Sequence, residues 1–366
     1  MISREKAPVI NNKKMAILVY GMTNNLGGME QFIHNYYPYL IDSFDFSFVN
    51  MYDKIFYQDE YEKQGNTVYK TANPKRNPFR HYYELKNILT NNGIDAIYVN
   101  MLSFANAIPI MAAKKAGVRI ILHAHSTNAN GVVKKVLHRL NRRFFCRPAQ
   151  LKIACSDKSG KYMFGNQNYY VVQNAIDGKK YHFDKVKRAE IRNKYRIEPH
   201  EIVIGNIGRL SKEKNQKQLI DVLYELQKQK DIYKLMLVGD GRMKKDLMDY
   251  ATRKNVIKKV IFTGRIKNSS DMYQAMDVFA MPSFYEGLSL TALEAQASGL
   301  PCIFTDNMDK GVDISGKSVF LPIGKKATSA WANVCLKLNF SKRINVDVDI
   351  KSSADILKEI ISKALV

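Results

Sequence analysis

The sequence predicts an α/β protein with two doubly wound domains, each built on a parallel sheet. The chain has 366 residues, more than one typical domain contains. Short runs rich in β-branched residues alternate with amphipathic helical segments, which is typical of parallel strands joined by crossover helices. This alternation is interrupted at residues 174–181, where turn residues replace the apolar periodicity, and then resumes. We therefore expect one domain at 1–176 and another at 177–351.

Each predicted domain opens with an apolar strand and continues with helix and strand in turn. The first should contain strands at 15–20, 46–51, 95–100, 119–124, 151–155 and 169–173, with helices near 29–41, 78–91, 104–116, 132–145 and 157–164. The second should contain strands at 202–207, 234–238, 260–262, 278–281 and 302–305, with helices near 214–230, 241–254, 269–276 and 287–298.

The composition is that of a globular protein in a reducing compartment. Hydrophobic residues make up 46% and charged residues 25% of the chain. No apolar run approaches the roughly 18 residues that a membrane-spanning helix needs. The four cysteines show no pairing motif and no metal-ligand spacing, so free thiols are expected. We therefore expect a cytoplasmic protein.

The net charge is unusual. The chain has 57 Lys and Arg against 34 Asp and Glu, a formal charge of +23, and the excess is spread over both halves. Such a charge favours anionic partners, which include nucleic acid, an anionic membrane and phosphorylated substrates.

Residues 132–147 concentrate this charge, with six Lys or Arg and no acid. Apolar residues recur in the same segment at helical spacing. One interpretation is an ordinary surface helix whose apolar stripe packs on its sheet. The other is a basic helix that rests on anionic lipid, helped by residues 75–80. Both can hold together, with the stripe buried and the bases facing phosphate headgroups.

Two glycine-rich turns in the second half are candidates for binding phosphate. Residues 205–215 follow a predicted strand and precede a helix, so backbone N–H groups can face an anion while Arg209 and Lys214 add charge. The turn at Gly239 also follows a strand, at the end where open α/β sheets bind ligands. The alternative is a pair of ordinary turns with solvated bases, and spacing alone does not decide between them.

Two carboxylates in residues 282–301 form the second candidate feature. Glu286 is expected in a strand-to-helix turn and Glu294 two helical turns later. At a rise of about 1.5 Å per residue they are roughly 12 Å apart, too far for the paired carboxylates of a glycosidase. The separation suits a ligand held at two ends. A solvated carboxylate is the alternative for Glu294, but its neighbours are mostly apolar.

The order of these motifs resembles that of the retaining glycosyltransferases of family 4, which have the GT-B fold. The resemblance rests on Gly27–Glu30, His123–Thr127, Asn174–Asp177, Gly208–Asn215, Leu237–Gly241, Phe262–Gly264 and Glu286–Pro301. It spans nearly the whole chain and is strongest to bacterial capsule and exopolysaccharide transferases. It implies two Rossmann-like domains facing a central cleft, with a final helix at 352–366 that packs back on the first domain.

The resemblance also implies a role for each candidate residue. Arg209 and Lys214 would stabilise the diphosphate leaving group. Glu294 would hold the ribose and Glu286 the donor sugar. His125 would lie beside the reacting sugar, with His123 as the alternative on the same strand face. Further contacts to the nucleotide-sugar are expected from Gly27, Gly28, Gly239, Arg265, Gly287, Leu288 and Ser289.

No metal and no other cofactor is expected. The chain has a DxD motif at Asp347 to Asp349, but it lies far beyond the donor motifs. The expected reaction moves a hexose from a nucleotide-sugar, a UDP-sugar in our interpretation, to a lipid-linked or saccharide acceptor in surface polysaccharide synthesis. The expected location is the inner face of the cytoplasmic membrane, bound peripherally to anionic lipid.

Two alternatives differ in activity. Another GT-B enzyme, such as a nucleotide-sugar epimerase, would share the donor site but would form product without an acceptor. A basic nucleic-acid-binding protein would explain the charge, but no recognised nucleic-acid module or aromatic stacking pattern accompanies the bases.

Overall fold

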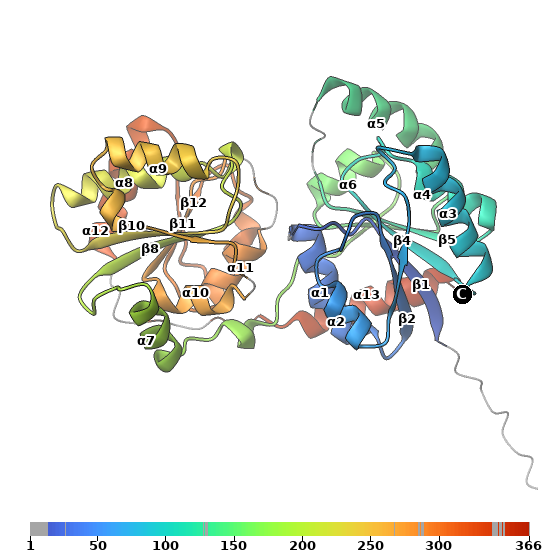
Figure 1. Cartoon of the computed structure of the whole chain (residues 1–366), viewed down its shortest axis with the longest axis horizontal. Helices are drawn as coiled ribbons and strands as arrows, with labels where there is room; N and C mark the ends of the chain where they lie inside the picture. The colour runs from blue at the N-terminus through green and yellow to red at the C-terminus, as the bar shows by residue number, and fades with distance from the viewer. Residues whose placement is uncertain are drawn as a thin grey trace, which may run out of the picture. The chain divides into compact units, whose positions relative to one another are not determined.

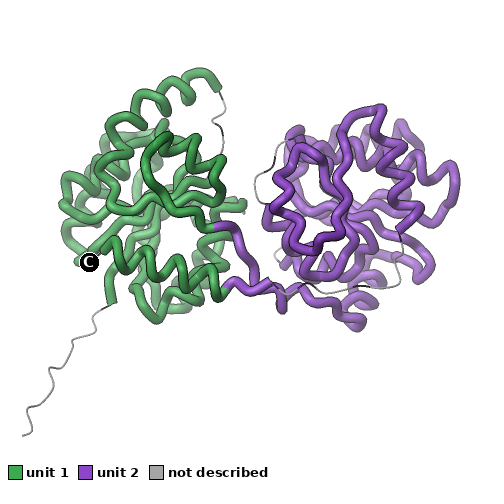
Figure 2. The backbone as a smooth tube through the Cα atoms, turned by 180° about the vertical axis from the view of Figure 1, so that it is seen from behind, with its two compact units in different colours: residues 1–172, 351–366 green, residues 173–350 purple. Residues whose placement is uncertain are grey.

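The computed structural model divides the chain into two compact units, coloured separately in Figure 2. Unit 1 comprises Met1–Val172 and Lys351–Val366, and unit 2 comprises Gln173–Ile350. The break between them falls at Val172, slightly before the position expected from the turn residues. The structure describes residues 14–25, 27–126, 128, 131–266, 268–284, 286, 289–338, 343, 346 and 348–365.

Unit 1 contains a seven-stranded parallel sheet with the order β3-β2-β1-β4-β5-β6-β7. Figure 1 labels β1, β2, β4 and β5 of this sheet. Its strands are β1 (Met15–Tyr20), β2 (Phe44–Asn50), β3 (Thr67–Lys70), β4 (Ala96–Met101), β5 (Arg119–Ala124), β6 (Leu151–Ala154) and β7 (Tyr170–Val171). Its helices are α1 (Gly28–Leu40), α2 (Gln58–Lys63), α3 (Pro78–Asn91), α4 (Ile108–Ala116), α5 (Val132–Phe145), α6 (Asp157–Phe164) and α13 (Ile350–Leu365).

Helix α13 belongs to unit 1 although it is the last helix of the chain. Its residues Ala354, Leu357 and Ile361 recur at helical spacing and are almost completely buried. Ser353 shares a hydrogen bond with the hydroxyl of Tyr36 on α1. Burial of this apolar face is what holds α13 to the unit formed by the first half of the chain.

Unit 2 contains a six-stranded parallel sheet with the order β10-β9-β8-β11-β12-β13. Its strands are β8 (Ile202–Ile207), β9 (Tyr233–Val238), β10 (Val260–Gly264), β11 (Val278–Met281), β12 (Cys302–Thr305) and β13 (Val319–Leu321). Its helices are α7 (Lys185–Lys194), α8 (Gln216–Gln227), α9 (Lys244–Arg253), α10 (Ser270–Ala275), α11 (Leu290–Ala297) and α12 (Thr328–Lys337).

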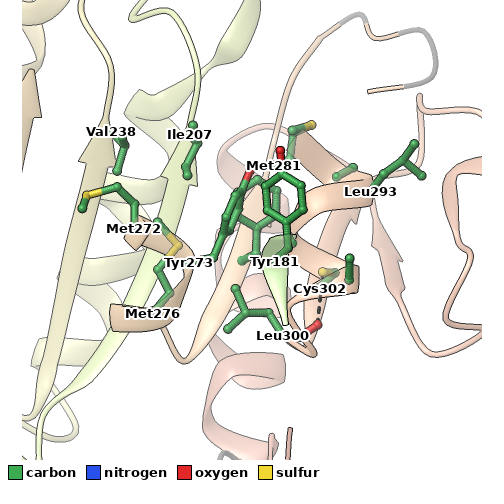
Figure 3. Packing of buried hydrophobic residues seen from close by; sticks show 14 of the residues in the cluster. Tyr181, Ile207, Val238, Met272, Tyr273, Met276, Met281, Leu293, Leu300 and Cys302 are labelled. Atoms are coloured by element: carbon green, nitrogen blue, oxygen red, sulfur yellow. Dashed lines mark hydrogen bonds between the residues drawn. The ribbon is translucent and has the colours of Figure 1, made fainter. Parts of the chain in front are cut away.

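The core of unit 2 lies on both faces of its sheet. One face packs against α8 and α12 and includes the fully buried Trp331. The other face packs against α10 and α11, and Figure 3 shows Tyr181 and Tyr273 within this cluster, their ring centroids 6.0 Å apart. The second cluster therefore surrounds the helix that carries Glu294.

The predicted fold class is confirmed, whereas several short elements were missed. Strands β3 and β13 are edge strands of four and three residues, too short for a recognisable alternation of apolar and polar residues. Helices α2, α7 and α12 were also not predicted. Helix α7 has few apolar residues, so its periodicity is weak. Helix α4 begins at Ile108 rather than near 104, with Pro109 in its first turn.

Of the two interpretations of the helix at 132–145, the one in which its apolar stripe packs on the sheet is wrong. In α5 the stripe faces solvent: the exposed fraction is 72% for Val133, 58% for Leu140 and 69% for Phe144. The buried position is His138, because polar side chains of α5 find hydrogen-bond partners in unit 1. Among the described residues, no helix has the length and apolar character required to span a bilayer.

Candidate active site

The candidate residues of unit 2 gather at the carboxyl ends of its parallel strands. Strands β8 and β11 are neighbours in the sheet, but the chain continues from them in opposite directions, to β9 and to β12. This is the topological switch point, where open α/β sheets form a ligand-binding crevice. The turn after β8 carries Arg209 and Lys214, and the turn after β11 carries Glu286.

The two glycine turns of unit 2 pack backbone against backbone. The N–H of Gly208 donates to the carbonyl of Val238, and the N–H of Leu210 donates to the carbonyl of Asp240. A Cβ atom on Gly239 would lie 2.1 Å from the carbonyl oxygen of Gly208, and Gly239 has a φ of +134°. Glycine is therefore required at 239 to bring the two turns together at this edge.

The turns after β8 and β11 are joined across the switch point. The N–H of Phe284 donates to the carbonyl of Glu213 at 2.8 Å, and the side-chain amide of Asn215 donates to the carbonyl of Pro282 at 3.1 Å. The ammonium of Lys214 forms an ion pair with Glu286, and both side chains are largely buried. An ammonium has three donors, so this pair leaves Lys214 further donors for an anion. Arg209 is exposed at the same edge.

Glu294 lies on α11 and is 3% exposed, so the alternative of a solvated helix carboxylate is wrong. Its Oε2 accepts hydrogen bonds from the hydroxyl of Tyr273 at 2.7 Å and from Ser269 at 3.3 Å. Burial raises the pKa of this carboxyl, whereas the hydrogen bonds from Tyr273, Tyr181 and Ser269 lower it. The structure therefore directs Glu294 toward α10 and Glu286 toward Lys214, so the two carboxylates do not share partners.

The structure describes two of the other residues of unit 2 that are expected to contact the nucleotide, Ser289 and Arg265. Ser289 precedes α11, is almost completely buried, and its hydroxyl lies 3.0 Å from that of Thr291. Arg265 is exposed directly after β10. Gly287 and Leu288 lie outside the described residues.

In unit 1, the glycine turn at Gly27 and Gly28 opens α1. A Cβ atom on Gly28 would meet no atom within 4 Å, so its backbone borders open space. The buried Glu30 fixes the preceding turn, because its Oε1 accepts hydrogen bonds from the N–H of Thr23 at 3.0 Å and from its hydroxyl at 2.8 Å. The first turn of α1 is thus held with its backbone accessible, an arrangement that can bind an anion.

The two candidate histidines lie at the carboxyl end of β5, with ring centroids 3.9 Å apart. His123 is completely buried, and its Nδ1 lies 2.7 Å from the hydroxyl of Tyr98. His125 is half-buried, and its Nε2 lies 2.9 Å from Oδ1 of Asn100. The side-chain amide of Asn100 donates to the carbonyl of Tyr20. Asn100 therefore connects His125 to the end of β1, where the glycine turn starts.

Burial keeps both rings neutral at physiological pH. It lowers the pKa of His125 to about 3 and the pKa of His123 well below its ordinary value, to which the neighbouring His125 also contributes. Because Oδ1 of Asn100 accepts from Nε2 of His125, Nδ1 is the acceptor atom of this ring. His125 can therefore accept a hydrogen bond from a hydroxyl group, and its partial exposure makes it the more accessible of the two rings.

No cluster of His, Cys, Asp or Glu suited to a metal ion occurs in the described part of the chain. Asp347 of the DxD motif lies outside the described residues, so the structure does not test the motif.

Several residues that complete these sites were not found from the sequence. Tyr273 on α10 and Ser269 directly before α10 hold Glu294, and Asn100 and Tyr98 orient the histidines from the neighbouring strand. None of them belongs to a motif. Their only advance signal is position, since Tyr98 and Asn100 occupy a predicted strand, which the structure pairs with the histidine strand.

Comparison with known protein families adds an independent observation. Residues 187–314 match the family described as glycosyl transferases group 1. This segment is a group 1 glycosyltransferase domain. It includes the turn with Arg209 and Lys214, the turn with Glu286, and Glu294 on α11. The predicted activity class, glycosyl transfer, is thereby confirmed.

Two named relatives match the chain beyond this domain. The Bacillus subtilis protein EpsF, named as a glycosyltransferase, is 28% identical over 337 residues, which cover 88% of this chain and 86% of EpsF. An Escherichia coli enzyme named UDP-Gal:alpha-D-GlcNAc-diphosphoundecaprenol alpha-1,3-galactosyltransferase is 27% identical over 217 residues, 54% of each chain.

A solved structure confirms the GT-B fold of this glycosyltransferase. The crystal structure of Anabaena HepE in complex with UDP has a TM-score of 0.78 to this chain and 19% sequence identity, and the match covers 96% of this chain and 100% of HepE.

Proposed function

We propose that this glycosyltransferase moves a hexose from a UDP-sugar to a lipid-linked acceptor, with retention of anomeric configuration and without a bound metal. The observation that carries the proposal is the switch point of unit 2, where Lys214 pairs with Glu286 and Arg209 lies exposed in the same turn as Lys214, beside two interlocked glycine turns. Two cations in one turn favour a diphosphate, and a carboxylate paired with one of them favours the attached sugar.

In the proposed reaction, the bond between the anomeric carbon and the diphosphate oxygen breaks, and the electron pair leaves with UDP. The acceptor hydroxyl oxygen bonds to the same face of that carbon, and its proton passes to the departing phosphate oxygen. Arg209 and Lys214 stabilise the charge that develops on the leaving group. These two cations are why we assign the reaction no metal.

Each remaining residue has its own part in the proposal. Glu294 accepts hydrogen bonds from the ribose hydroxyls, and Glu286 accepts them from the donor sugar. In unit 1, Nδ1 of the neutral His125 accepts a hydrogen bond from a hydroxyl of the reacting sugar, and the backbone of Gly28 binds phosphate. Gly27, Gly239, Arg265, Gly287, Leu288 and Ser289 complete the proposed nucleotide-sugar contacts.

The donor and acceptor classes are supported by the relatives. The E. coli relative is named for a UDP-sugar donor and a diphosphoundecaprenol-linked acceptor. A Campylobacter jejuni relative, 24% identical over 84% of this chain, is also named for a diphospho-undecaprenol acceptor. Such acceptors reside in membranes, so we place the enzyme peripherally on the inner face of the cytoplasmic membrane.

A nucleotide-sugar screen followed by a transfer assay tests the proposal. UDP-sugars should raise the melting temperature of the protein more than GDP- or ADP-sugars with the same hexose. The stabilising sugar should then be consumed with a polyprenyl-diphosphate saccharide and hardly at all without it. Conversion of the sugar in the absence of acceptor would indicate an epimerase and contradict the proposal.

The role of Glu286 is tested by comparing two ligands. Glu286→Gln should bind free UDP like the wild type but should lose affinity for the UDP-sugar and lower the transfer rate. Because Lys214 would lose its charged partner, the control is the Lys214→Met, Glu286→Gln double variant, which should bind UDP weakly. Equal transfer rates for Glu286→Gln and wild type would remove Glu286 from the sugar site.

A further inference from the structure

We infer that α5 and the pocket beside it form a binding surface for an anionic lipid bilayer, in which the apolar face of α5 enters the membrane interface and the pocket takes lipid phosphate. Figure 1 shows α5 on unit 1, together with α6, the helix that forms the other side of the pocket. The inference gives the proposed membrane location a defined contact, and it extends the proposed function to residues outside the candidate active site.

The apolar face of α5 points away from the protein. Six large apolar side chains of this helix are exposed, each by 40% or more: Val132, Val133, Val136, Leu137, Leu140 and Phe144. Most of them recur at the spacing of one helix face. A contiguous apolar face of this kind is unfavourable in water and marks a contact with a protein or a membrane.

The opposite face of α5 is polar, and it is this face that holds the helix on unit 1. Nδ1 of His138 accepts from the N–H of Phe104 at 3.1 Å, and its ring stacks on Tyr162 of α6 with centroids 4.4 Å apart. The amide of Asn141 donates to the carbonyl of Phe104 at 2.8 Å, and Arg142 donates to the carbonyl of Tyr162 at 3.2 Å. These bonds fix the orientation, so the outward direction of the apolar face is built into the fold.

Basic side chains line the polar side of α5, next to Tyr162 of α6. A pocket of about 340 Å³ is lined by Asn128, Lys135, His138, Arg139, Arg142 and Tyr162. Its three cations are spaced i, i+4 and i+7, so they form one row along the helix. The lining contains no carboxylate, and the sequence has no Asp or Glu between Asp95 and Asp157. The pocket therefore suits an anionic phosphate group, because no carboxylate in the lining repels it and no additional cation is needed to neutralise it.

The juxtaposition of the two features favours a bilayer over other anionic partners. A phospholipid joins its phosphate covalently to its acyl chains, and α5 carries its basic row and its apolar row on different faces of one 14-residue helix, as helices of the membrane interface do. Nucleic acid or free phosphate would engage the cations but leave the apolar row in water. The charge of the surrounding segment adds attraction to anionic headgroups, which salt screens.

Vesicle sedimentation of the full chain tests this inference without donor or acceptor, so its outcome is independent of glycosyl transfer. The probes are vesicles of phosphatidylcholine alone and of equal parts phosphatidylcholine and phosphatidylglycerol. We expect at least tenfold stronger binding to the anionic vesicles at low salt. Equal binding to the two vesicle types, or none to either, would overturn the inference.

Two variants separate the basic row from the apolar row. Lys135→Gln with Arg139→Gln should weaken binding to anionic vesicles at least fivefold. Arg142 is kept, because it donates to the carbonyl of Tyr162 and positions α5. The matched control is Lys114→Gln with Lys115→Gln, which removes the same charge from exposed positions of α4 in the same unit and should bind nearly like the wild type. Equal losses of vesicle binding in both variants would show that binding depends only on the net charge of the protein, which would overturn the role of the pocket.

The apolar variant is Val136→Ser with Leu140→Ser and Phe144→Ser, and its control is Ile356→Ser on an exposed position of α13. The triple variant should keep its circular dichroism spectrum and melting temperature, since the three side chains pack little, but should dissociate from vesicles at a salt concentration that the wild type withstands. Retention of wild-type binding would overturn the inference.

Two further measurements exclude other occupants. Inorganic diphosphate should not displace the wild type from anionic vesicles, and displacement at matched phosphate concentration would assign the pocket to a soluble phosphate. Sedimentation velocity should give the same oligomeric state for the wild type and the triple variant. A dimer of the wild type that the triple variant lacks would assign the apolar face to a second copy of the chain.

Discussion

Replacing Glu294 with Gln should weaken binding of UDP roughly tenfold and leave the fold intact. Glutamine has nearly the same shape and keeps one acceptor oxygen, so the hydroxyls of Tyr273 and Ser269 keep a partner. What is lost is the negative charge. A hydrogen bond to a charged group contributes about 1.5–3 kcal/mol, against about 1 kcal/mol for a neutral one. A difference of about 1.4 kcal/mol on the ribose hydroxyls corresponds to a tenfold rise in Kd.

Replacing Glu294 with Ala should reduce both binding and stability. The hydroxyl of Tyr273 is buried, and removal of its acceptor at 2.7 Å costs about 1–3 kcal/mol in the free energy of unfolding. A contact at 3.2 Å from the same hydroxyl to the carbonyl of Thr291 remains and offsets part of this loss. The Gln and Ala variants therefore distinguish the loss of the negative charge from the loss of the hydrogen bond with Tyr273.

The pH dependence of stability separates the variants further. Burial raises the pKa of Glu294 in the folded protein above its value in the unfolded chain. The carboxyl therefore costs no stability below its unfolded pKa and the full amount above its folded pKa. The free energy of unfolding of Glu294→Gln should accordingly rise relative to the wild type as pH increases through that window.

Isothermal titration calorimetry with UDP and urea denaturation at two pH values provide the measurements. Glu190→Gln, on the exposed surface of α7 in the same unit, is the control for removing one carboxylate and should match the wild type in Kd. A Glu294→Gln variant that is folded and binds UDP with wild-type affinity would refute the ribose role of this residue.

Three further predictions concern the turns and the histidine. Arg209→Ala and Lys214→Ala should each lower the transfer rate by more than about tenfold, because the leaving group loses a charged donor. EDTA should leave the activity of the wild type largely intact. A complete loss of activity that magnesium reverses would contradict the metal-free reaction. Gly239→Ala should lower the free energy of unfolding by at least about 1–3 kcal/mol, because its Cβ would overlap the backbone of the facing turn. The control is Gly28→Ala, which should keep the melting temperature of the wild type in the same thermal scan. The imidazole of His125 should remain neutral from about pH 8 down to about pH 5, and stability should fall as pH drops from about 6.5 toward 3; an NMR titration with a midpoint near the ordinary pKa would show that the ring is solvated.

The sequence predicts the fold well because the buried strands of both sheets are apolar and regularly spaced. It also locates the turns with Arg209 and Gly239, because these follow predicted strands and parallel strands bring their carboxyl ends to one edge. The orientation of α5 could not be predicted in this way. Periodicity identifies which side chains share a face, but the hydrogen bonds of His138 and Asn141 determine which face is buried.

Hydrogen-bond partners that lie on other helices or strands could not be predicted from the sequence either. Tyr273 lies on α10 and Glu294 on α11, and their hydrogen bond depends on how these two helices pack. The apolar neighbours of Glu294 indicated that the carboxylate is not an ordinary surface group, but not what holds it. The same holds for Asn100, whose contact with His125 follows from strand register rather than from any motif.

The position of α13 affects the order in which this protein can fold during synthesis. Domains generally fold as units as they emerge from the ribosome, the N-terminal one first. Here unit 1 needs residues 351–366, which are translated after all of unit 2. Unit 2 is therefore the first unit whose residues are all available, and the sheet of unit 1 must wait with the surface for Leu357 and Ile361 uncovered. A chain released after truncation at Ile350 should accordingly contain a protease-resistant unit 2 joined to a protease-sensitive unit 1.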